Sequence, residues 1–390
     1  MGVKVLIVGA GIVGAACARS LAHRGAAVTV VDRGAPASAT SAAGEGNLLV
    51  SDKGPGPELD LARYSLALWR SMGAQLVAEI GASFPSIEYQ LKGGVVVASD
   101  EQSAAALTRF AQAQHSAGVD AQLLDAPAAR DLEPELSSSI VSAVYYPDDA
   151  QVQPAIATEA LMAAARAAGV RVLANTPVTG ALRDAQGRLV GVTTPSGSIE
   201  ADHVVVAAGP WSSEVAVTLG GAAYVEPRKG LLLVTARMPQ RIWHKVYDTS
   251  YVGAVQSDEH DLQTSTVIES TAAGTVLIGS SRQNVGFDES IDVGVLRAIA
   301  EKALTLMPFL RDATVIRAYG GFRPLSRDHL PIIGADPDVA GLWYATGHEG
   351  AGIGLAPGTA ELLAAAMFDE TPSVRIEPFA PGRPSLRRVA

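Results

Sequence analysis

The chain contains very little cysteine, because Cys17 is the only one among 390 residues. One cysteine excludes an intramolecular disulfide and an iron–sulfur cluster held by this chain alone, and it fits a reducing compartment. Cys17 lies among alanines in the first expected helix, where the neighbouring sequence supplies no group that would activate a thiolate. We therefore expect Cys17 to be a packing residue.

Basic residues and long hydrophobic runs are also scarce. The chain has 30 Lys and Arg against 40 Asp and Glu, which gives a net charge of −10 and a pI near 5.2. This balance argues against nucleic acid or an anionic membrane as a general partner. No run reaches the roughly 18 apolar residues of a transmembrane helix, and no targeting signal precedes the first apolar run. We expect a cytoplasmic protein without a transmembrane segment and, since the 7 histidines lack the spacing of metal ligands, without a metal site.

The clearest feature that is present is a glycine-rich turn between two apolar runs near the N-terminus. Residues 3–8 form the first run, the turn carries Gly9, Gly11 and Gly14, and the second run ends at Asp32. This order is typical of a βαβ unit that binds a dinucleotide. The first glycine allows the tight turn, the second lets the backbone approach a pyrophosphate, and the third lets helix and strand pack closely. Asp32 is placed to bind a ribose hydroxyl, but the pattern by itself does not distinguish FAD from NAD.

A second glycine-rich loop follows a short apolar run more than 300 residues later. It covers residues 347–354, and we expect a helix to begin after it at about Pro357. Two glycine-lined helix starts so far apart suggest one extended cofactor. A helix N-terminus near the N1–C2=O edge of a flavin stabilises the negative charge of the reduced ring, so the second loop favours FAD. The alternative is a glycine turn that only closes the sheet.

The order of apolar patterns predicts an α/β fold, with a Rossmann-like FAD-binding domain and a second, largely antiparallel β (α+β) substrate domain. With 48% hydrophobic residues, the chain is long enough for two cores. We expect a discontinuous FAD-binding domain at residues 1–83, 149–215 and 324–390. The substrate domain is expected at residues 84–148 and 216–323, with strands that include residues 86–91, 246–251 and 315–320.

Several motifs are spread over the whole chain: the N-terminal βαβ unit, Ala207-Ala208-Gly209-Pro210-Trp211, Phe322-Arg323-Pro324, Asp328-His329-Leu330-Pro331-Ile332-Ile333-Gly334 and the loop at residues 347–354. Together these motifs resemble the D-amino acid oxidase family of FAD-dependent oxidoreductases. The sequence of the last loop most resembles the D-hydroxyproline dehydrogenase, opine oxidase and glycine oxidase-like branches of this family. The resemblance spans nearly the whole chain, although the middle of the chain carries the least specific sequence.

The resemblance implies non-covalently bound FAD and an amine substrate such as a D-amino acid, D-proline, hydroxyproline or glycine. Hydride would pass from the α carbon to flavin N5 and leave an imine. The alternatives are an opine oxidase, a flavoprotein subunit that relays electrons to an iron–sulfur partner, and an NAD-linked dehydrogenase. The protein could also form a homo-oligomer.

The residue that corresponds to Arg323 binds the substrate carboxylate in this family, and a guanidinium matches a carboxylate in two places. We expect Arg323 to follow an apolar strand, and the competing interpretation is an ion pair with Asp328. Tyr251, on a strand, could bind the carboxylate or line the pocket. His348 could contact flavin or substrate, or cap its turn. Glu45 lies in a long loop, residues 33–56, that could reach the ring.

The expected catalytic residues are Arg323, Tyr251 and His348. The expected cofactor-binding residues are Gly9, Gly11, Ile12, Val13, Gly14, Asp32, Arg33, Ser41, Gly44, Gly46, Asn47, Leu48, Val178, Ala208, Gly209, Trp211, Arg323, Gly347, His348, Glu349, Gly350, Ala351, Gly352 and Ile353.

Overall fold

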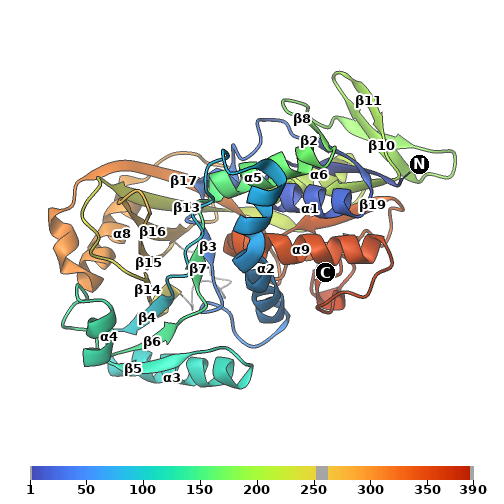
Figure 1. Cartoon of the computed structure of the whole chain (residues 1–390). Coiled ribbons are helices and arrows are strands. Elements are labelled where there is room, and N and C mark those ends of the chain that lie inside the picture. The colour runs from blue at the N-terminus through green and yellow to red at the C-terminus, as the bar shows by residue number, and fades with distance from the viewer. Residues whose placement is uncertain (1, 252–261, 387–390) are drawn as a thin grey trace.

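A computed structural model describes residues 2–251 and 262–386. Figure 1 shows two groups of elements side by side, one around a mostly parallel sheet and one around a larger antiparallel sheet. The first sheet has the strand order β18-β19-β12-β1-β2-β8, in which only the β18–β19 pair is antiparallel. Its strands are β1 (Lys4–Val8), β2 (Ala27–Val31), β8 (Arg171–Leu173), β12 (His203–Val206), β18 (Ile332–Ala335) and β19 (Leu342–Thr346).

Both faces of the parallel sheet are covered, which explains why its strands read as continuous apolar runs. On β1, Val5 and Ile7 face the helical layer, whereas Leu6 and Val8 face the opposite layer. The helices on the first face are α1 (Ile12–His23), α2 (Pro57–Ile80), α5 (Pro154–Ala167) and α9 (Gly352–Met367). The other face carries α6 (Ser212–Thr218) and a three-stranded sheet of β9 (Gly180–Arg183), β10 (Leu189–Thr194) and β11 (Gly197–Glu200).

The second group is built on an eight-stranded sheet in the order β17-β13-β16-β15-β14-β4-β6-β5. All its neighbouring strands are antiparallel except β14 and β4. The strands are β4 (Gly94–Ala98), β5 (Gln122–Asp125), β6 (Ser142–Tyr146), β13 (Val225–Thr235), β14 (Lys245–Asp248), β15 (Gln263–Ser270), β16 (Val276–Arg282) and β17 (Val315–Ser326). Helix α8 (Val293–Leu306) packs on one face through Val295, Ile299 and Ala303, and α3 (Glu101–Ser116) and α4 (Ala126–Leu132) pack near β5 and β6.

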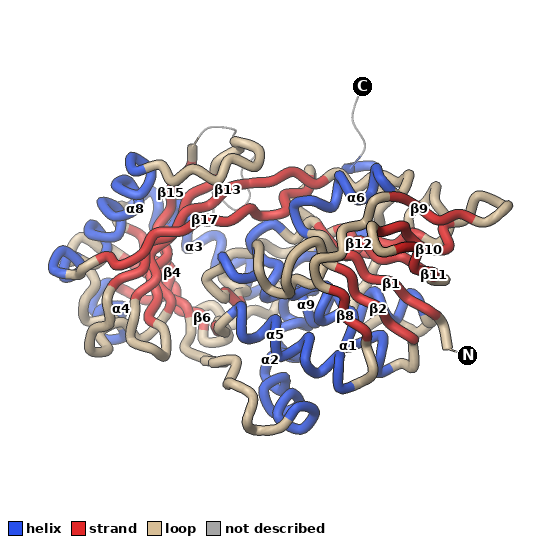
Figure 2. The backbone as a smooth tube through the Cα atoms, turned by 90° about the horizontal axis from the view of Figure 1, so that it is seen from above, coloured by secondary structure: helices blue, strands red, loops and turns tan. Residues whose placement is uncertain are grey.

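Two long strands and one short strand pair link the two groups. Strands β13 and β17 are long, and Figure 2 shows them running from the antiparallel sheet toward the parallel one. A short antiparallel pair, β3 (Asn47–Leu48) and β7 (Ala150–Gln151), lies between them. The fold class predicted from the sequence is confirmed. The domain boundaries stay a prediction, although β4, β5 and β6 do belong to the antiparallel sheet.

Four local expectations were wrong. Residues 86–91 form no strand and make one isolated bridge, Gln90 with Gln151, because Glu88 has a φ of 52° that breaks an extended run. Strand β14 ends at Asp248, and the Asp248 carboxylate accepts a hydrogen bond from the backbone N–H of Tyr251 (3.0 Å), which turns the chain into a helical segment. Strand β17 is longer than expected, so Arg323 lies within it and not after it.

The fourth error concerns α9, which begins at Gly352, so that Pro357 lies inside the helix. A proline in this position leaves the carbonyl of Ile353 without its usual helical N–H donor. The indole N–H of Trp69 donates to the carbonyls of Ile353 (3.2 Å) and Gly354 (3.1 Å). The hydroxyl of Ser65 also donates to the Gly354 carbonyl (2.6 Å). Side chains of α2 therefore replace the missing hydrogen bond, a compensation that the local pattern does not reveal.

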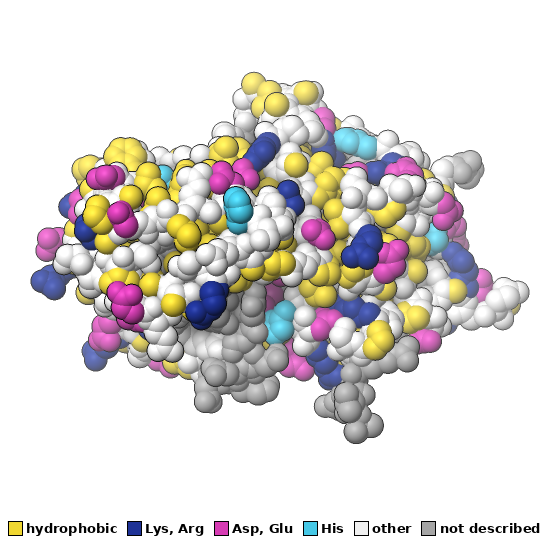
Figure 3. Space-filling model, turned by 90° about the horizontal axis from the view of Figure 1, so that it is seen from below, with side chains coloured by type: hydrophobic (Ala, Val, Ile, Leu, Met, Phe, Trp, Pro, Cys, Tyr) yellow, Lys and Arg dark blue, Asp and Glu magenta, His cyan; other side chains and the backbone are white. Residues whose placement is uncertain are grey.

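The surface view in Figure 3 shows Lys and Arg side chains interspersed with Asp and Glu on the face it presents. Within residues 2–251 and 262–386, no helix is long and apolar enough to span a membrane. The same residues contain no group of three or more His, Cys, Asp or Glu side chains that could hold a metal ion.

Candidate functional site

The first glycine turn leaves no room for a side chain at Gly9 or Gly14. Gly9 has a φ of 118°, and a Cβ built on it would lie 2.3 Å from the carbonyl oxygen of Ala207. A Cβ on Gly14 would lie 2.0 Å from the carbonyl oxygen of Gly9, inside the turn itself. Gly11 is extended and begins α1 without a side-chain cap. The residues present therefore fit a pyrophosphate held by the start of α1.

The long loop after β2 lies across this turn. The Ser41 hydroxyl accepts a hydrogen bond from the N–H of Ile12 (2.9 Å), so the loop contacts the start of α1, in which Val13 is the second residue. The Asp32 carboxylate accepts hydrogen bonds from the N–H groups of Ala10 (2.6 Å) and Gly34 (2.8 Å). Asp32 thus fixes the turn, and its contact with a ribose stays a proposal.

The end of β12 lies beside the end of β1. Gly209 has a φ of 54°, and a Cβ on it would have only the Thr40 hydroxyl within 4.0 Å. Just after it, the Trp211 ring lies 4.0 Å beneath the Arg33 guanidinium and stacks on Phe287. Two other predicted cofactor residues, Ala208 and Val178, are partly buried against the apolar layer behind β1. No contact with a nucleotide is assigned to them.

The carboxyl ends of β1, β12 and β19, which are parallel neighbours, lie at one edge of the sheet. The second glycine loop follows β19 there and leads into α9, which packs against α1 (Figure 1). Gly347 has a φ of 75°, and a Cβ on Gly44 would lie 2.7 Å from Cδ1 of Ile353, so the long loop also closes on the start of α9. An edge of this kind is where open α/β sheets bind ligands, and both helix starts predicted to hold FAD lie there.

The remaining predicted cofactor residues of the long loop lie on or beside the β3–β7 pair. A Cβ on Gly46 would lie 1.9 Å from the Val152 carbonyl oxygen, and Asn47 and Leu48 pair with Gln151 and Ala150. A small pocket lies between this loop and α9. Its lining includes Asn47, Asp52, Lys53, Tyr251, Gly350 and Ala351.

His348 is buried at the start of the second loop. Its Nε2 lies 2.9 Å from the Thr359 hydroxyl on α9, and burial lowers the pKa of His348 to about 3. The imidazole is therefore neutral and oriented by α9. No contact with a substrate follows from this geometry, so a catalytic role stays a proposal.

Glu349 connects the second loop to the antiparallel sheet. Its Oε1 accepts a hydrogen bond from Nη1 of Arg228 (2.8 Å) and lies 3.8 Å from Nε of Arg282, and its Oε2 lies 3.3 Å from Nδ1 of His329. Burial raises the pKa of Glu349, but the His329 hydrogen bond and the two arginines outweigh it, and the pKa is lowered. Glu349 has a φ of 46°, which is rare for a residue with a side chain. The ion pairs thus stabilise an unusual backbone conformation next to the expected flavin edge.

Arg323 lies within β17, directly opposite Arg228 on β13, so both side chains point to one face of the sheet. Nη1 of Arg323 donates to the carbonyl of Ser281 (2.8 Å). The half-buried guanidinium occupies space that a side chain at residue 230 would fill, since a Cβ on Gly230 would lie 2.4 Å from Nη1. Burial, followed by the charge of Arg282, lowers the pKa of Arg323.

Two contacts place Arg323 beside both cofactor loops. The Thr40 hydroxyl donates to the backbone carbonyl of Phe322 (2.8 Å), and a Cβ on Gly350 would lie 3.6 Å from Cδ and Nε of Arg323. The competing ion pair with Asp328 is wrong, because Asp328 binds Nε (2.6 Å) and Nη2 (2.7 Å) of Arg383.

Tyr251 and Glu45 lie on the same side of the antiparallel sheet as the arginines. The Tyr251 ring stacks on Tyr247 (centroids 5.4 Å apart) and lies 5.0 Å from Cζ of Arg282. Burial raises the pKa of Tyr251, so its hydroxyl stays protonated. A Cβ on Gly279 would lie 2.1 Å from Oε1 of Glu45, which places the carboxylate of the long loop directly over β16.

Sequence reasoning missed Arg228 and Arg282. Both are almost fully buried, with relative exposures of 1% and 3%. Each lies in or at the end of a strand whose neighbours in sequence carry no recognisable motif, and the site depends on β13, β16 and β17 being adjacent. The only available signal was arginine within otherwise apolar strands, which is uncommon unless the charge is paired.

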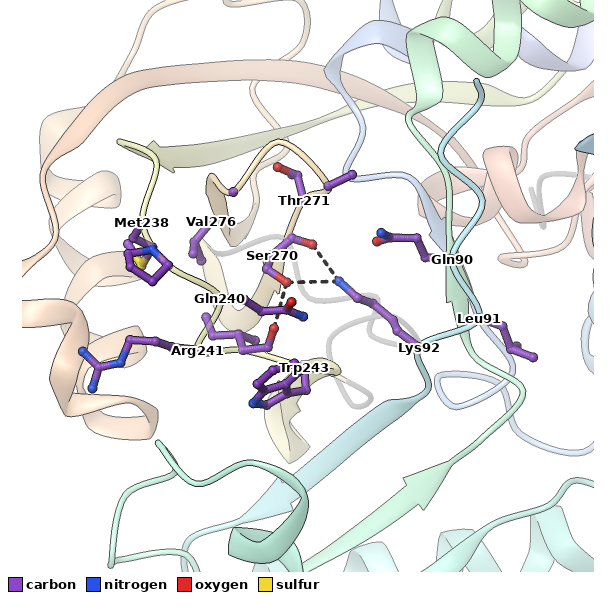
Figure 4. A pocket seen from close by; sticks show the side chains of 14 residues that line it. Gln90, Leu91, Lys92, Met238, Gln240, Arg241, Trp243, Ser270, Thr271 and Val276 are labelled. Atoms are coloured by element: carbon purple, nitrogen blue, oxygen red, sulfur yellow. Dashed lines mark hydrogen bonds between the residues drawn. The ribbon is translucent and has the colours of Figure 1, made fainter. Parts of the chain in front are cut away.

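A separate crevice of about 480 Å³ lies away from these residues, between the segments at residues 90–92, 238–243 and 270–276. In Figure 4, Lys92 extends into it and Arg241 points away from it. The Lys92 ammonium donates to the Ser270 carbonyl (2.6 Å) and to Oε1 of Gln151 (3.1 Å), and burial lowers its pKa to about 8. These neutral acceptors already occupy the ammonium, so the crevice offers no evident chemistry of its own.

Comparison with known proteins places the chain in a family. The FAD dependent oxidoreductase family (DAO) matches residues 4–366. The glycine oxidase of Pseudomonas aeruginosa is 31% identical to this chain over 98% of its length and 99% of the relative. The hydrogen cyanide synthase subunit HcnC of the same organism is 30% identical, covering 97% of this chain and 95% of the relative. The crystal structure of glycine oxidase from Geobacillus kaustophilus matches with a TM-score of 0.87 and 27% identity, covering 97% of this chain and 99% of that one.

These matches confirm the resemblance noted from the motifs, and the two glycine-lined helix starts fit the cofactor that the family name states. The chain belongs to the D-amino acid oxidase (DAO) family of FAD-dependent oxidoreductases.

Proposed function

We propose that the protein oxidises a small amine that carries a carboxylate, an amino acid or a secondary amine, to the corresponding imine. D-amino acids, D-proline or hydroxyproline, and glycine are the substrate types that the sequence motifs favour. The names of the relatives support the proposal, since glycine oxidases match nearly the whole chain.

The observation that carries the proposal is the position of Arg323. Its side chain lies beside the turn at residues 349–351, and the backbone of the preceding residue, Phe322, is bonded to Thr40 in the long loop; these are the two segments expected to face the flavin ring. A planar guanidinium binds a carboxylate in two places and would hold the substrate with its α carbon toward the cofactor. FAD, when bound, supplies the hydride acceptor at N5.

The other residues around the site hold the turn at residues 349–351 in place or exclude water. Glu349 and Arg228 fix the turn against β13 by their ion pair. Tyr251 and Tyr247 form an apolar wall beside Arg282. Such a wall excludes water and strengthens the carboxylate–guanidinium interaction.

The test is anaerobic reduction of the purified flavoprotein with a panel of D- and L-amino acids, imino acids and opines. We expect bleaching of the flavin absorbance by at least one carboxylated amine. Bleaching by none of them, with FAD fully bound and reducible by dithionite, would contradict the proposal. A yellow protein as isolated would exclude the NAD-linked alternative.

The attachment of FAD is expected to be non-covalent. The loop at residues 38–50 contains neither His nor Cys, and Cys17 is buried in α1. Acid precipitation should release the yellow colour into the supernatant, and colour retained in the pellet would contradict this expectation.

A second candidate is a flavoprotein subunit of a heteromeric complex, which the name of the similar hydrogen cyanide synthase subunit favours. Its iron–sulfur partner would have to supply the cluster, since one cysteine cannot. If substrate reduces the flavin of the isolated chain, the chain catalyses the oxidation itself and does not only relay electrons. The native mass of the purified protein shows whether it forms a homo-oligomer or a complex with a partner. The cytoplasm is the location we propose, because a single buried cysteine fits a reducing compartment.

A further inference from the structure

We propose that the proton released by the substrate amine leaves the site along one face of the antiparallel sheet, from Glu45 past the ion pair of Lys245 and Glu269 to Lys92 in the crevice. These four residues are called the proton route below. The inference rests on the proposed function and adds the path by which its proton departs. The crevice has no chemistry of its own, and its role is to connect the route to solvent.

The proposed oxidation has to release one proton in each turnover. The nitrogen of an amino acid or secondary amine is protonated near neutral pH, and only the neutral amine has the electron pair that forms the C=N bond as hydride leaves the α carbon. The substrate ammonium therefore gives one proton to a base before the hydride departs. Because the residues around the site are largely buried, that proton needs other groups to carry it out.

Glu45 is placed to accept the proton. A Cβ on Gly279 of β16 would lie 2.1 Å from Oε1 of Glu45. Two residues further along β16, about 7 Å away, the Ser281 carbonyl accepts the hydrogen bond from Arg323. Oε1 of Glu45 is buried and has no hydrogen-bond partner among the described residues. An amine whose carboxylate is bound by Arg323 can therefore give its proton to this oxygen.

The same face of the sheet carries a buried ion pair beside Glu45. Lys245 of β14 and Glu269 of β15 form it, with relative exposures of 0% and 1%. Glu269 lies opposite Leu277 of β16, which is two residues from Gly279, so Glu269 points to the side on which Glu45 lies. A buried ion pair contributes little stability for its desolvation cost. Here it provides an acceptor and a donor of protons next to the first base.

Lys92 connects the ion pair to the crevice of about 480 Å³. Its ammonium donates to the carbonyl of Ser270, the residue after Glu269, and its side chain extends into the crevice (Figure 4). Burial, followed by the charge of Lys92, lowers the pKa of Lys245. Burial likewise lowers the pKa of Lys92, to about 8. Both lysines therefore release a proton more readily than an exposed lysine does.

A second set of contacts holds the two ends of the route together. The Asn47 side-chain amide donates to Oε2 of Glu45 (2.9 Å), and Lys92 donates to Oε1 of Gln151 (3.1 Å). Asn47 and Gln151 lie directly opposite each other in the β3–β7 pair, so their side chains point to the same side. Two facing amides thus separate Glu45 from Lys92.

Unpaired polar atoms line the space between these groups. Oδ1 of Asn47, Oδ2 of Asp149 and the hydroxyl of Tyr247 are buried and have no hydrogen-bond partner within residues 2–251 and 262–386. Buried polar atoms of this kind bind internal water, which would carry the proton from one side chain of the route to the next.

Other ionisable side chains also face the route. Oδ1 of Asp149 is bonded to the long loop, and burial raises the pKa of Tyr247, so its hydroxyl stays protonated. On the outer side, Glu133 accepts a hydrogen bond from the backbone N–H of Trp243 (2.7 Å) and pairs with His244. The remaining groups are Tyr145 near Lys92, and Tyr251, Arg282, Tyr319 and Arg323 near Glu45.

The first experiment measures the limiting rate constant of anaerobic flavin reduction in the FAD-loaded enzyme, with a substrate that the wild type oxidises. In Lys92→Met we expect it to fall about 10-fold or more at pH 7, where the substrate amine is protonated. Above the pKa of the substrate amine, where the amine binds without that proton, it should be within about 3-fold of the wild type. A wild-type rate at pH 7, or an equal loss at both pH values, would overturn the inference.

Lys302→Met is the matched control. Lys302 of α8 also donates to a backbone carbonyl of β15, that of Thr264, but α8 packs on the opposite face of the sheet. This variant should keep the wild-type rate at both pH values. A loss equal to that of Lys92→Met, with the same pH dependence, would also overturn the inference.

The second experiment supplies a proton carrier from outside. Methylammonium added to Lys92→Met at pH 7 should enter the crevice and raise the rate constant about 5-fold or more, with saturation. Tetramethylammonium has the same charge but no proton to exchange, so it should restore nothing. No restoration by methylammonium, or equal restoration by both ions, would overturn the place of Lys92 on the route.

The third experiment removes the ion pair. Lys245→Met combined with Glu269→Leu replaces both charges by apolar groups, a change that buried pairs often tolerate. The double variant should show the same loss at pH 7 as Lys92→Met, and methylammonium should not restore it, because the block lies behind the crevice. A wild-type rate at pH 7 would overturn the inference. If the double variant does not retain FAD, the comparison of Lys92→Met with Lys302→Met decides.

Failure of this inference differs from failure of the proposed function. A wild-type enzyme that is reduced by a carboxylated amine, with a Lys92→Met variant that is reduced equally fast at pH 7, refutes only the proton route. A wild-type enzyme that no carboxylated amine reduces refutes the proposed function itself.

Discussion

The two regions that we propose bind ligands are specified by the sequence in opposite ways. The turn at residues 9–14 works through backbone, and Gly9 and Gly14 are required because a side chain on either would collide with a carbonyl oxygen 2.0–2.3 Å away. The region on the antiparallel sheet works through side chains, Arg228, Arg282 and Arg323, from three adjacent strands. A backbone site leaves a contiguous signature in the sequence. A side-chain site assembled by strand pairing leaves no such signature, although it is the part that we propose binds the substrate.

The largest effect should come from filling the backbone site. Gly11→Val is expected to abolish FAD binding, because the branched side chain would occupy space required by the pyrophosphate. The variant should still fold, since Gly11 is extended and a Cβ there meets only the Ser41 hydroxyl, at 3.1 Å. The absorbance ratio of flavin to protein measures occupancy. Full occupancy would show that this turn is not the phosphate site.

The next prediction tests the side-chain site without changing a charge. In Gly230→Ala the new Cβ would lie within 2.4–2.7 Å of the Arg323 guanidinium, which would have to move. Because the end of an arginine is flexible, folding should be little affected, but kcat/KM for a carboxylated amine should fall about 10-fold, roughly the effect of 1.4 kcal/mol. FAD content should stay normal. Unchanged kinetics would show that the position of Arg323 does not matter.

The third prediction concerns Asp149, which lies between the two regions. Its Oδ1 accepts hydrogen bonds from the N–H groups of Val50 (2.9 Å) and Ser51 (3.3 Å), and burial raises its pKa to about 7. A carboxyl whose folded pKa is raised favours the folded state below its unfolded pKa, near 4, and this contribution is lost as the pH rises through about 7.

The Tm of Asp149→Asn minus the Tm of the wild type, both measured with FAD bound, should therefore increase from pH 5 to pH 8. Asp120→Asn, at an exposed position, is the control and should show no such trend. A Tm difference between Asp149→Asn and the wild type that is the same at both pH values would contradict the raised pKa.

The smallest effect is expected from a glycine that serves neither region. Gly73 lies in the interior of α2, and a Cβ there would meet nothing within 4 Å. Gly73→Ala should raise the free energy of unfolding by about 0.5–1 kcal/mol through helix propensity, with FAD content and kinetics unchanged. Denaturant unfolding measures it, and a loss of stability would mean that this glycine has a packing role.

The parts of the fold that could be predicted are those with local causes. The βαβ unit follows from residues 3–32 alone, because the strand, turn and helix each have a short-range pattern. The start of α9 was placed too late because Pro357 indicates a helix start, whereas Trp69 and Ser65 satisfy the carbonyls it disturbs. That compensation comes from α2, almost 300 residues away in sequence.

The candidate site shows the same limit. Arg323 could be named because its Phe-Arg-Pro motif is contiguous and resembles a known family. Arg282 could not, since its place beside Arg323 depends on the pairing of β13, β16 and β17, and its ion pair depends on Glu349 from the turn after β19. Tyr251 is among the predicted site residues, but the sequence pattern places it on a strand. In the structure the strand ends at Asp248, whose carboxylate accepts a hydrogen bond from the backbone N–H of Tyr251.

The central claim is that Arg323 holds the substrate carboxylate beside the flavin, and its most direct test is the rate of anaerobic flavin reduction in Arg323→Ala. We predict that reduction by a carboxylated amine slows by roughly 30-fold or more, since losing a charged hydrogen bond costs about 2–5 kcal/mol. Reduction by the matching amine without its carboxylate should change far less, Arg323→Lys should also be impaired, and FAD content should stay near normal. An equal slowing for both amines, or a loss of FAD, would contradict the claim and assign Arg323 a structural role.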